Sequence, residues 1–265
     1  MSEHEDIASL REWLNTESGL YARAWEQQQI NHFLSNVFGY HAIQIGMPHW
    51  DLLQNNRILH KWHTHNHNPI ETIREGAQLV LCAPEQLPFA AESIDLLVLP
   101  HVLEAASDPH QVLREVQRVL VPEGKVVLSG FNPWSLWGLR DRLPGLECLL
   151  PVEPQYQISH GRVADWLEVL SFEVTDEVTG CYRPLCSELK WLQRWRFMDK
   201  LGARWWPMLG GIHVLKATKR VGSMTLVGMD WSKKASVTAG GARETAAANS
   251  NIHTVEAGHA RDDKT

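Results

Sequence analysis

The sequence lacks an apolar run long enough to cross a membrane. The longest such run lies around Ile94–Pro100, far short of the ~20 residues that a spanning helix requires. The first six residues are acidic and do not show the basic and then apolar order of a secretory signal. From these two absences we expect a protein of the cytoplasm.

Cysteine is also scarce, and the cysteines show no metal-binding or redox spacing. The 265 residues include four cysteines, with no C-x-x-C pair and no zinc-finger pattern. A reduced protein that needs neither disulfides nor structural zinc is the simplest interpretation. Tyrosine and phenylalanine are few as well, 4 and 6, whereas tryptophan reaches 12.

The net charge of −6 conceals a segregation of charge along the chain. Residues 1–180 carry 11 basic and 24 acidic side chains, and residues 181–220 carry 9 basic and 2 acidic ones. Because the large acidic block repels phosphates, nucleic acid is not an expected partner. The segment 185–206 combines basic residues with Trp and Leu at helical spacing. Three interpretations stay open for it: a lid over a substrate, a helix packed on the sheet, or a weak contact with a membrane surface or partner.

Helical and strand patterns alternate through most of the chain. Helices are expected at 6–36 (with a break near 15–19), 110–120, 161–170 and 187–201, and strands at 41–45, 58–63, 78–82, 93–99, 125–129, 172–178 and 212–218. Such alternation predicts an α/β fold with a parallel sheet covered on both faces. We expect an N-terminal helical extension at 1–37, a main domain at 38–220 and a disordered tail at 221–265, which is rich in small residues without periodicity.

Residues 79–132 carry several short motifs in a fixed order. These are Leu87-Pro88-Phe89, Ser93-Ile94-Asp95, His101-Val102-Leu103-Glu104, Asp108-Pro109, Leu113-Arg114-Glu115-Val116 and Pro122-Glu123-Gly124. The series resembles class I S-adenosylmethionine-dependent methyltransferases of the type 11-like, small-molecule kind. The resemblance implies a Rossmann-like methyltransferase fold, which has a mostly parallel seven-stranded sheet with a last antiparallel strand, in three layers.

The same resemblance implies S-adenosylmethionine as the cofactor and a small-molecule or lipid-like methyl acceptor. It assigns cofactor binding to Gln44, Gly46, Met47, Cys82, Ala83, Pro100 and His101. Gly46 and Met47 would face the methionine end of the cofactor, and His101 would lie near the transferred methyl group. His101 is also the one candidate for a catalytic role, as a general base.

Three positions that are acidic in the family are neutral in this sequence. Gln44 stands near the end of the first strand, residues 58–67 offer only His, Thr and Asn, and Cys82 stands before the Leu-Pro-Phe turn. Neutral acceptors form weaker hydrogen bonds than carboxylates, so a lowered cofactor affinity is expected. An alternative therefore stays open: an inactive methyltransferase fold that acts as a binding or scaffold module through the basic, Trp-rich helix.

Two residue types cluster in a way that has more than one interpretation. His60, His63, His65 and His67 could ligate a transition metal from one strand face, or could be solvated imidazoles. Since no Cys or carboxylate completes the set nearby, we predict no metal site. Seven tryptophans stand where this fold places ligands or lids, which predicts a wide pocket lined by aromatic rings; they are Trp50, Trp134, Trp137, Trp191, Trp195, Trp205 and Trp206.

Overall fold

A computed structural model describes residues 10–66, 78–143, 145, 148–185 and 189–220 of the chain. The chain divides into two compact units, residues 1–223 and 224–265. The predicted disordered tail lies outside the described residues, and the account below concerns the first unit.

Seven strands form one sheet, as the resemblance implies. They are β1 (His41–Ile45), β2 (His60–His65), β3 (Gln78–Leu81), β4 (Ile94–Pro100), β5 (Leu120–Phe131), β6 (Phe172–Gly180) and β7 (Ile212–Lys219). Their order is β3-β2-β1-β4-β5-β7-β6. The first five strands pair in parallel, and β7 runs antiparallel to both of its neighbours. The predicted Rossmann-like sheet with a last antiparallel strand is confirmed.

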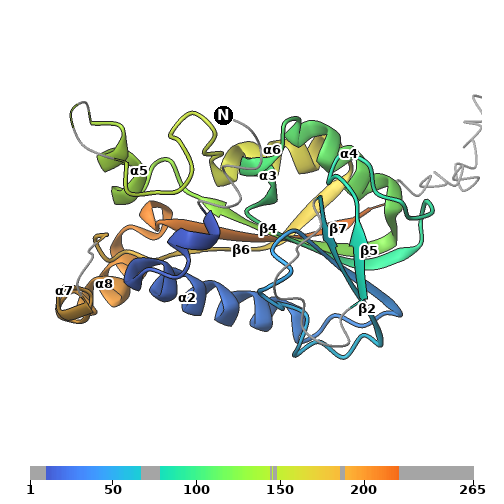
Figure 1. Cartoon of the computed structure of the whole chain (residues 1–265), viewed down its shortest axis with the longest axis horizontal. Helices are drawn as coiled ribbons and strands as arrows, with labels where there is room; N and C mark the ends of the chain where they lie inside the picture. The colour runs from blue at the N-terminus through green and yellow to red at the C-terminus, as the bar shows by residue number, and fades with distance from the viewer. Residues whose placement is uncertain (1–9, 67–77, 144, 146–147, 186–188, 221–265) are drawn as a thin grey trace, which may run out of the picture. The chain divides into compact units, whose positions relative to one another are not determined.

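Helices cover both faces of this sheet (Figure 1). The helices are α2 (Glu17–Leu34), α3 (Val102–Ala105), α4 (Pro109–Val119), α5 (Leu136–Asp141), α6 (His160–Val169), α7 (Leu189–Arg194) and α8 (Phe197–Trp205), followed by the short 3-10 turn η1 (Pro207–Leu209). Along β4, Leu96 and Val98 pack into the core that includes α2, whereas Leu97 and Leu99 pack into the core that includes α4 and α6. A strand buried on both faces is expected in a parallel sheet, and three layers result.

Capping residues fix where two of these helices begin. The Thr16 hydroxyl accepts a hydrogen bond from the Gly19 N–H at 3.1 Å, so α2 starts directly after it. The Asp108 carboxylate accepts from the Gln111 N–H at 3.0 Å, and Pro109 occupies the first turn of α4. Both arrangements satisfy backbone donors that a helix start leaves unpaired.

Several motif residues hold the loops near the strand ends. Arg118 donates to the carbonyl oxygens of Leu87 and Phe89, each at 2.9 Å, and Glu115 accepts from the Leu87 N–H at 3.1 Å. Asp95 accepts from the N–H groups before and at the start of β1. The motif therefore fixes the Leu-Pro-Phe turn and aligns β1 with β4.

Several predicted boundaries are wrong by more than a residue, and three elements show the largest differences. β2 begins and ends two residues later than expected, because its polar sequence gives a weak strand pattern. β5 begins at Leu120 rather than 125, since Leu120 already pairs with Ile94 ahead of the Pro122–Gly124 turn. The helix expected at 187–201 is interrupted: hydrogen bonds at Arg196 and Met198 run to the third preceding residue, and this tight turn separates α7 from α8.

Candidate functional site

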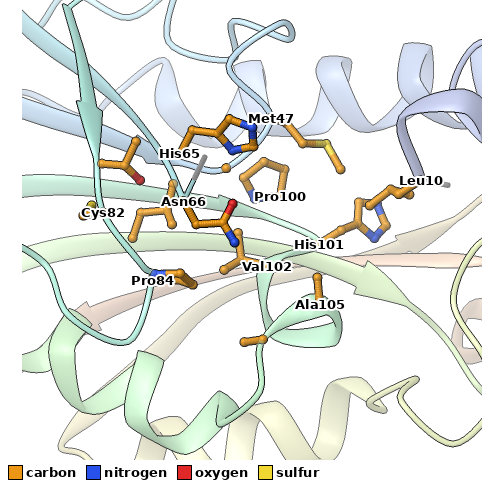
Figure 2. Close-up of a pocket in the computed structure, with 14 residues that line it drawn as sticks. Leu10, Met47, His65, Asn66, Cys82, Pro84, Pro100, His101, Val102 and Ala105 are labelled. Carbon is orange, nitrogen blue, oxygen red and sulfur yellow. The ribbon is translucent and has the colours of Figure 1, made fainter. Parts of the chain in front are cut away.

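A cleft lies at the edge of the sheet where β1, β2, β3 and β4 end (Figure 2). Its lining is Leu10, Ile45, Gly46, Met47, Thr64, His65, Asn66, Cys82, Pro84, Pro100, His101, Val102, Ala105 and Ala106. In open α/β folds, ligands bind at this carboxyl edge of the strands. Apolar side chains dominate the lining and a few polar groups converge on it, which is the usual chemistry of a small-molecule site.

The backbone takes unusual conformations at two points of this cleft. Gly46 and Met47, directly after β1, have φ of 74° and 46°, and His101, directly after β4, has φ of 52°. Left-handed conformations are uncommon for residues with a side chain and concentrate at functional sites. Here they turn the chain sharply out of two adjacent strands.

Gln44 holds the loop after β1 from inside the protein. Its side-chain NH₂ donates to the carbonyl oxygens of Met47 at 3.0 Å and Trp50 at 2.6 Å, and its Oε1 accepts from the Leu52 N–H at 2.9 Å. Gln44 is completely buried. An amide suits this position because the loop presents carbonyl oxygens, which need a donor.

The structure brings most of the predicted cofactor residues together. Gly46, Met47, Cys82, Pro100 and His101 all line the cleft. The other two predicted residues are not among its lining: Gln44 is engaged by the loop, and Ala83 follows Cys82 without facing the cleft. Cofactor binding by any of the seven stays a prediction.

The sequence shows polar groups at residues 58–67, but the resemblance assigns none of them to the cofactor, and three of them lie at the end of β2. Thr64, His65 and Asn66 line the cleft, but the strand was expected to end at 63. With the observed end at His65, these residues stand at the carboxyl end of the strand, where ligands bind in open α/β sheets.

His101 lies between two buried carboxylates. Its Nδ1 is 3.0 Å from Glu104 Oε2, and its Nε2 is 3.2 Å from Glu26 Oε2 on α2. The Ser129 hydroxyl donates to Glu26, and the Phe131 N–H donates to Glu104. His101, Glu26, Glu104 and Ser129 are all at most 5% exposed.

The charges in this network determine the protonation of His101. Burial alone would lower its pKa, but the carboxylates, Glu26 foremost, outweigh burial and raise the pKa of His101 to about 10. Burial raises the pKa of Glu104, and His101 opposes that rise. At neutral pH the ring is therefore an imidazolium that donates at both nitrogens. Such a group has no free lone pair to accept a proton, which favours a positioning role; a catalytic His101 stays a prediction.

A second buried histidine adjoins the network. His213 on β7 is 2% exposed, and its Nδ1 has no hydrogen-bond partner within the described part of the chain. A Cβ placed on Gly130 would lie 3.0 Å from the His213 ring and 3.1 Å from Glu104 Oε1, so glycine gives both side chains room. Burial, followed by repulsion from His160 and His101, lowers the pKa of His213 to about 3.

The prediction of a wide aromatic-lined pocket is wrong for this cleft, because none of the seven tryptophans is among its lining. Trp50 and Trp137 are 2% exposed and belong to the core beside α2. Their indole N–H groups donate to Gln27 and to the Arg183 carbonyl, each at 2.6 Å, which allows such large amphipathic rings to be buried. Trp191 and Trp205, by contrast, are exposed.

The histidine cluster is split between surface and interior. His60 is exposed, His63 is buried with its Nε2 3.5 Å from Asp51 Oδ1, and His65 lines the cleft. His67 lies outside the described residues. Over the described ranges, no group of three or more His, Cys, Asp or Glu side chains could hold a metal ion.

Comparisons with known proteins place this geometry among methyltransferases. The family described as "Methyltransferase domain" matches residues 55–128. An uncharacterized Escherichia coli (strain K12) protein, YafS, is 32% identical over 216 residues, which span 81% of this chain and 82% of that protein. A malonyl-[acyl-carrier protein] O-methyltransferase of Methylovorus sp. (strain MP688) is 43% identical over 61 residues, 23% of this chain and 21% of its own.

Solved structures show the same fold. An S-adenosylmethionine-dependent methyltransferase from Thermotoga maritima has a TM-score of 0.56 at 17% identity, over 79% of this chain and 94% of its own. Another such methyltransferase, from Archaeoglobus fulgidus, has a TM-score of 0.53 at 16% identity, over 74% of this chain and 94% of its own. At these identities the likeness concerns the fold alone.

Proposed function

The chain belongs to the class I S-adenosylmethionine-dependent methyltransferases, and on that premise we propose that its cleft binds S-adenosylmethionine and that the acceptor is a small or lipid-like molecule. The bound cofactor would supply a methyl group already activated by its sulfonium. Such a reaction depends mainly on proximity and alignment, and needs little acid–base assistance.

One observation carries the proposal: five of the seven residues that the resemblance assigns to the cofactor converge on one cleft at the carboxyl edge of β1 to β4. Gly46 and Met47 come from the loop after β1, Cys82 follows β3, Pro100 ends β4 and His101 follows it. These segments are far apart in the sequence, so their convergence is a property of the fold.

The chemistry of the cleft fits a nucleoside with a charged tail. The left-handed Gly46–Met47 turn lines the cleft where the methionine end would lie, and Thr64 and Asn66 line it with a hydroxyl and an amide that could contact ribose hydroxyls. Cys82 would contact the adenine. The free internal volume is only about 40 Å³, whereas small-molecule sites usually enclose roughly 300–1,000 Å³. Binding of a molecule as large as S-adenosylmethionine would therefore require the cleft to widen.

His101 supports alignment rather than proton transfer in this proposal. The imidazolium links α2, through Glu26, to α3, through Glu104. Both contacts lie directly behind the wall of the cleft. A fixed wall holds the reacting groups at short range, where alignment accelerates transfer.

The test is isothermal titration of the full chain with S-adenosylmethionine and S-adenosylhomocysteine. We expect saturable binding of both, and loss of binding in Cys82→Tyr, whose ring would fill the cleft. Cys148→Tyr is the matched control, since Cys148 is exposed and absent from the lining. Absence of binding by either ligand at millimolar concentration would refute the proposal and favour the scaffold alternative.

A further inference from the structure

Helix α8 presents two parallel stripes of different chemistry to solvent. Residues four apart in the sequence lie on the same side of a helix. Here one set of three residues at this spacing is basic, and the residue directly after each of them is apolar. The basic stripe is Arg196, which directly precedes α8 and has a helical backbone conformation, with Lys200 and Arg204; the apolar stripe is Phe197, Leu201 and Trp205. All six side chains are exposed, and the apolar ones are 51%, 43% and 68% exposed. We call these six residues the basic–aromatic face.

The opposite side of α8 is fixed against the protein. Gly202 is buried, and a Cβ there would lie 2.3 Å from the Tyr182 ring, so the helix backbone sits directly on that ring. Asp199 accepts hydrogen bonds from the Tyr21 hydroxyl of α2 at 2.5 Å and from Arg183 at 2.8 Å. The helix is thereby held with the basic–aromatic face turned outward.

Exposed aromatic and basic residues continue beyond this helix. Trp206 follows α8 and is 58% exposed, and Trp191 on α7 is 48% exposed. The Arg194 guanidinium lies 5.7 Å from the centre of the Trp191 ring, in a cation–π contact. Lys190 is exposed as well. Figure 1 shows α7 and α8 side by side at one end of α2.

The charge of this region is uniform at its surface. Residues 189–209 contain five basic side chains and one acidic side chain, Asp199, and Asp199 is engaged inward by Arg183. Residues 1–180, in contrast, carry a balance of −13. Positive charge therefore gathers on the surface that also exposes the large apolar rings.

We infer that the basic–aromatic face docks on a membrane surface rich in anionic phospholipids. Basic side chains would contact lipid headgroups, while Phe197, Leu201 and Trp205 enter the boundary between headgroups and acyl chains. Trp suits this boundary because its ring is apolar and its N–H is polar. Among the described residues, no helix is long and apolar enough to span a membrane, so the contact is peripheral.

The apolar stripe distinguishes a bilayer from other anionic partners. A nucleic acid or an acidic protein would satisfy the basic stripe, but three exposed apolar side chains in line on one helix gain only by leaving water. A bilayer accepts both stripes at once, because charge lies at its surface and hydrocarbon lies a few ångströms below. The inference concerns this surface alone and does not rest on cofactor binding.

The experiment is sedimentation of the full chain with vesicles of phosphatidylcholine, with and without phosphatidylglycerol. We expect binding only to the vesicles that contain phosphatidylglycerol, and a decrease as salt is raised. The variant Arg196→Gln, Lys200→Gln, Arg204→Gln should weaken partitioning by about a hundredfold, since each basic residue near such a surface contributes a factor of roughly five. The variant Phe197→Ser, Leu201→Ser, Trp205→Ser should weaken it as well.

A matched control removes three exposed basic residues elsewhere, as Arg57→Gln, Arg114→Gln, Arg142→Gln. This control should bind vesicles like the wild type, and circular dichroism should show that every variant is folded. Three results would overturn the inference: no binding to phosphatidylglycerol vesicles, equal loss in the control variant, or loss with the basic variant but not with the apolar one. The last result would indicate an acidic macromolecule as the partner.

Discussion

Glu26 and His101 are 75 residues apart in the sequence, and their side chains meet inside the protein with 3.2 Å between Oε2 and Nε2. Neither side chain is exposed to solvent. Glu26 belongs to α2 and His101 to the turn after β4, so this one contact joins the N-terminal helix to the wall of the cleft. Because of this buried ion pair, the shape of the cleft depends on the position of α2.

Removing one partner should therefore destabilise the protein. In Glu26→Gln the His101 imidazolium loses its main counter-charge, and such a change in a buried pair costs about 3–5 kcal/mol. The free energy of unfolding, measured by urea denaturation, should fall by that amount. NMR titration of the imidazole should show a pKa well below the value of about 10 in the wild type.

Glu17→Gln provides the control for this change. Glu17 is exposed in the first turn of the same helix, and its substitution should alter stability by less than about 0.5 kcal/mol. If Glu26→Gln unfolds the chain, the double variant Glu26→Gln, His101→Gln can be measured instead. Its free energy of unfolding should be higher than that of Glu26→Gln, because removing both charges should be less harmful than removing one. Equal stability of Glu26→Gln and the wild type would contradict the assigned ion pair.

His213 should make the protein sensitive to acid. Its pKa is lowered to about 3 in the folded state and is near 6.5 when unfolded. Protons then bind the unfolded chain first, so stability is complete above pH 6.5 and is lost as pH falls toward 3. The slope contributed by this group is about 1.4 kcal/mol per pH unit.

The measurement compares urea unfolding of the wild type and His213→Leu across this pH range. As pH falls, the free energy of unfolding of the wild type should decrease more steeply than that of His213→Leu. Above pH 7 the two curves should run parallel, which serves as the internal control. His101, Glu104 and His160 are nearby, and they are present in both proteins. Parallel curves down to pH 4 would show that His213 is not held neutral.

Much of the fold could be predicted because its strands are simple. The β4 residues around Leu97 are apolar on both faces, and a run that is this short and uniformly apolar is typical of a strand in a parallel sheet. The α7–α8 break could not be predicted in the same way. The break lies in the tight turn at Arg196 and Met198, and α8 beyond it is held by the contact of Gly202 with the Tyr182 ring, a contact between segments that no local pattern relates.

The sequence could predict which residues lie at the strand ends that form the site, but not where their side chains point. Gly46 follows β1 and Pro100 ends β4, and the motif order places the ends of these strands together. The direction of the Gln44 side chain depends on the path of the loop that it binds, and the pairing of His101 with Glu26 depends on how α2 packs. Both are tertiary features, which residue spacing does not contain.

Gln44→Glu tests whether the loop requires an amide donor. A carboxylate in this position would face the carbonyl oxygens of Met47 and Trp50 without a hydrogen to offer, while completely buried. Leaving buried acceptors unpaired costs about 1–3 kcal/mol, and more with a charge. We expect a loss of at least that size in urea denaturation. Gln193→Glu, which adds the same charge at an exposed position, is the control, and an equal effect of both would contradict the assigned role.

Three cysteines offer a local readout of ligand binding in one molecule. Cys82 lines the cleft, Cys148 is exposed, and Cys181 is buried in the core. Burial raises the pKa of the Cys82 thiol, so its alkylation should already be slow at mildly alkaline pH. S-adenosylhomocysteine at about ten times its dissociation constant should slow it a further tenfold, because only the free protein reacts.

The rates are measured for each peptide by mass spectrometry after iodoacetamide treatment. Alkylation of Cys148 should be unchanged by the ligand. Cys181 separates two explanations, since a ligand that merely suppresses unfolding would protect Cys181 and Cys82 in parallel. Protection of Cys82 alone locates the ligand in the cleft between β1 and β4. If iodoacetamide alkylates Cys82 at the same rate with and without bound ligand, the ligand binds elsewhere.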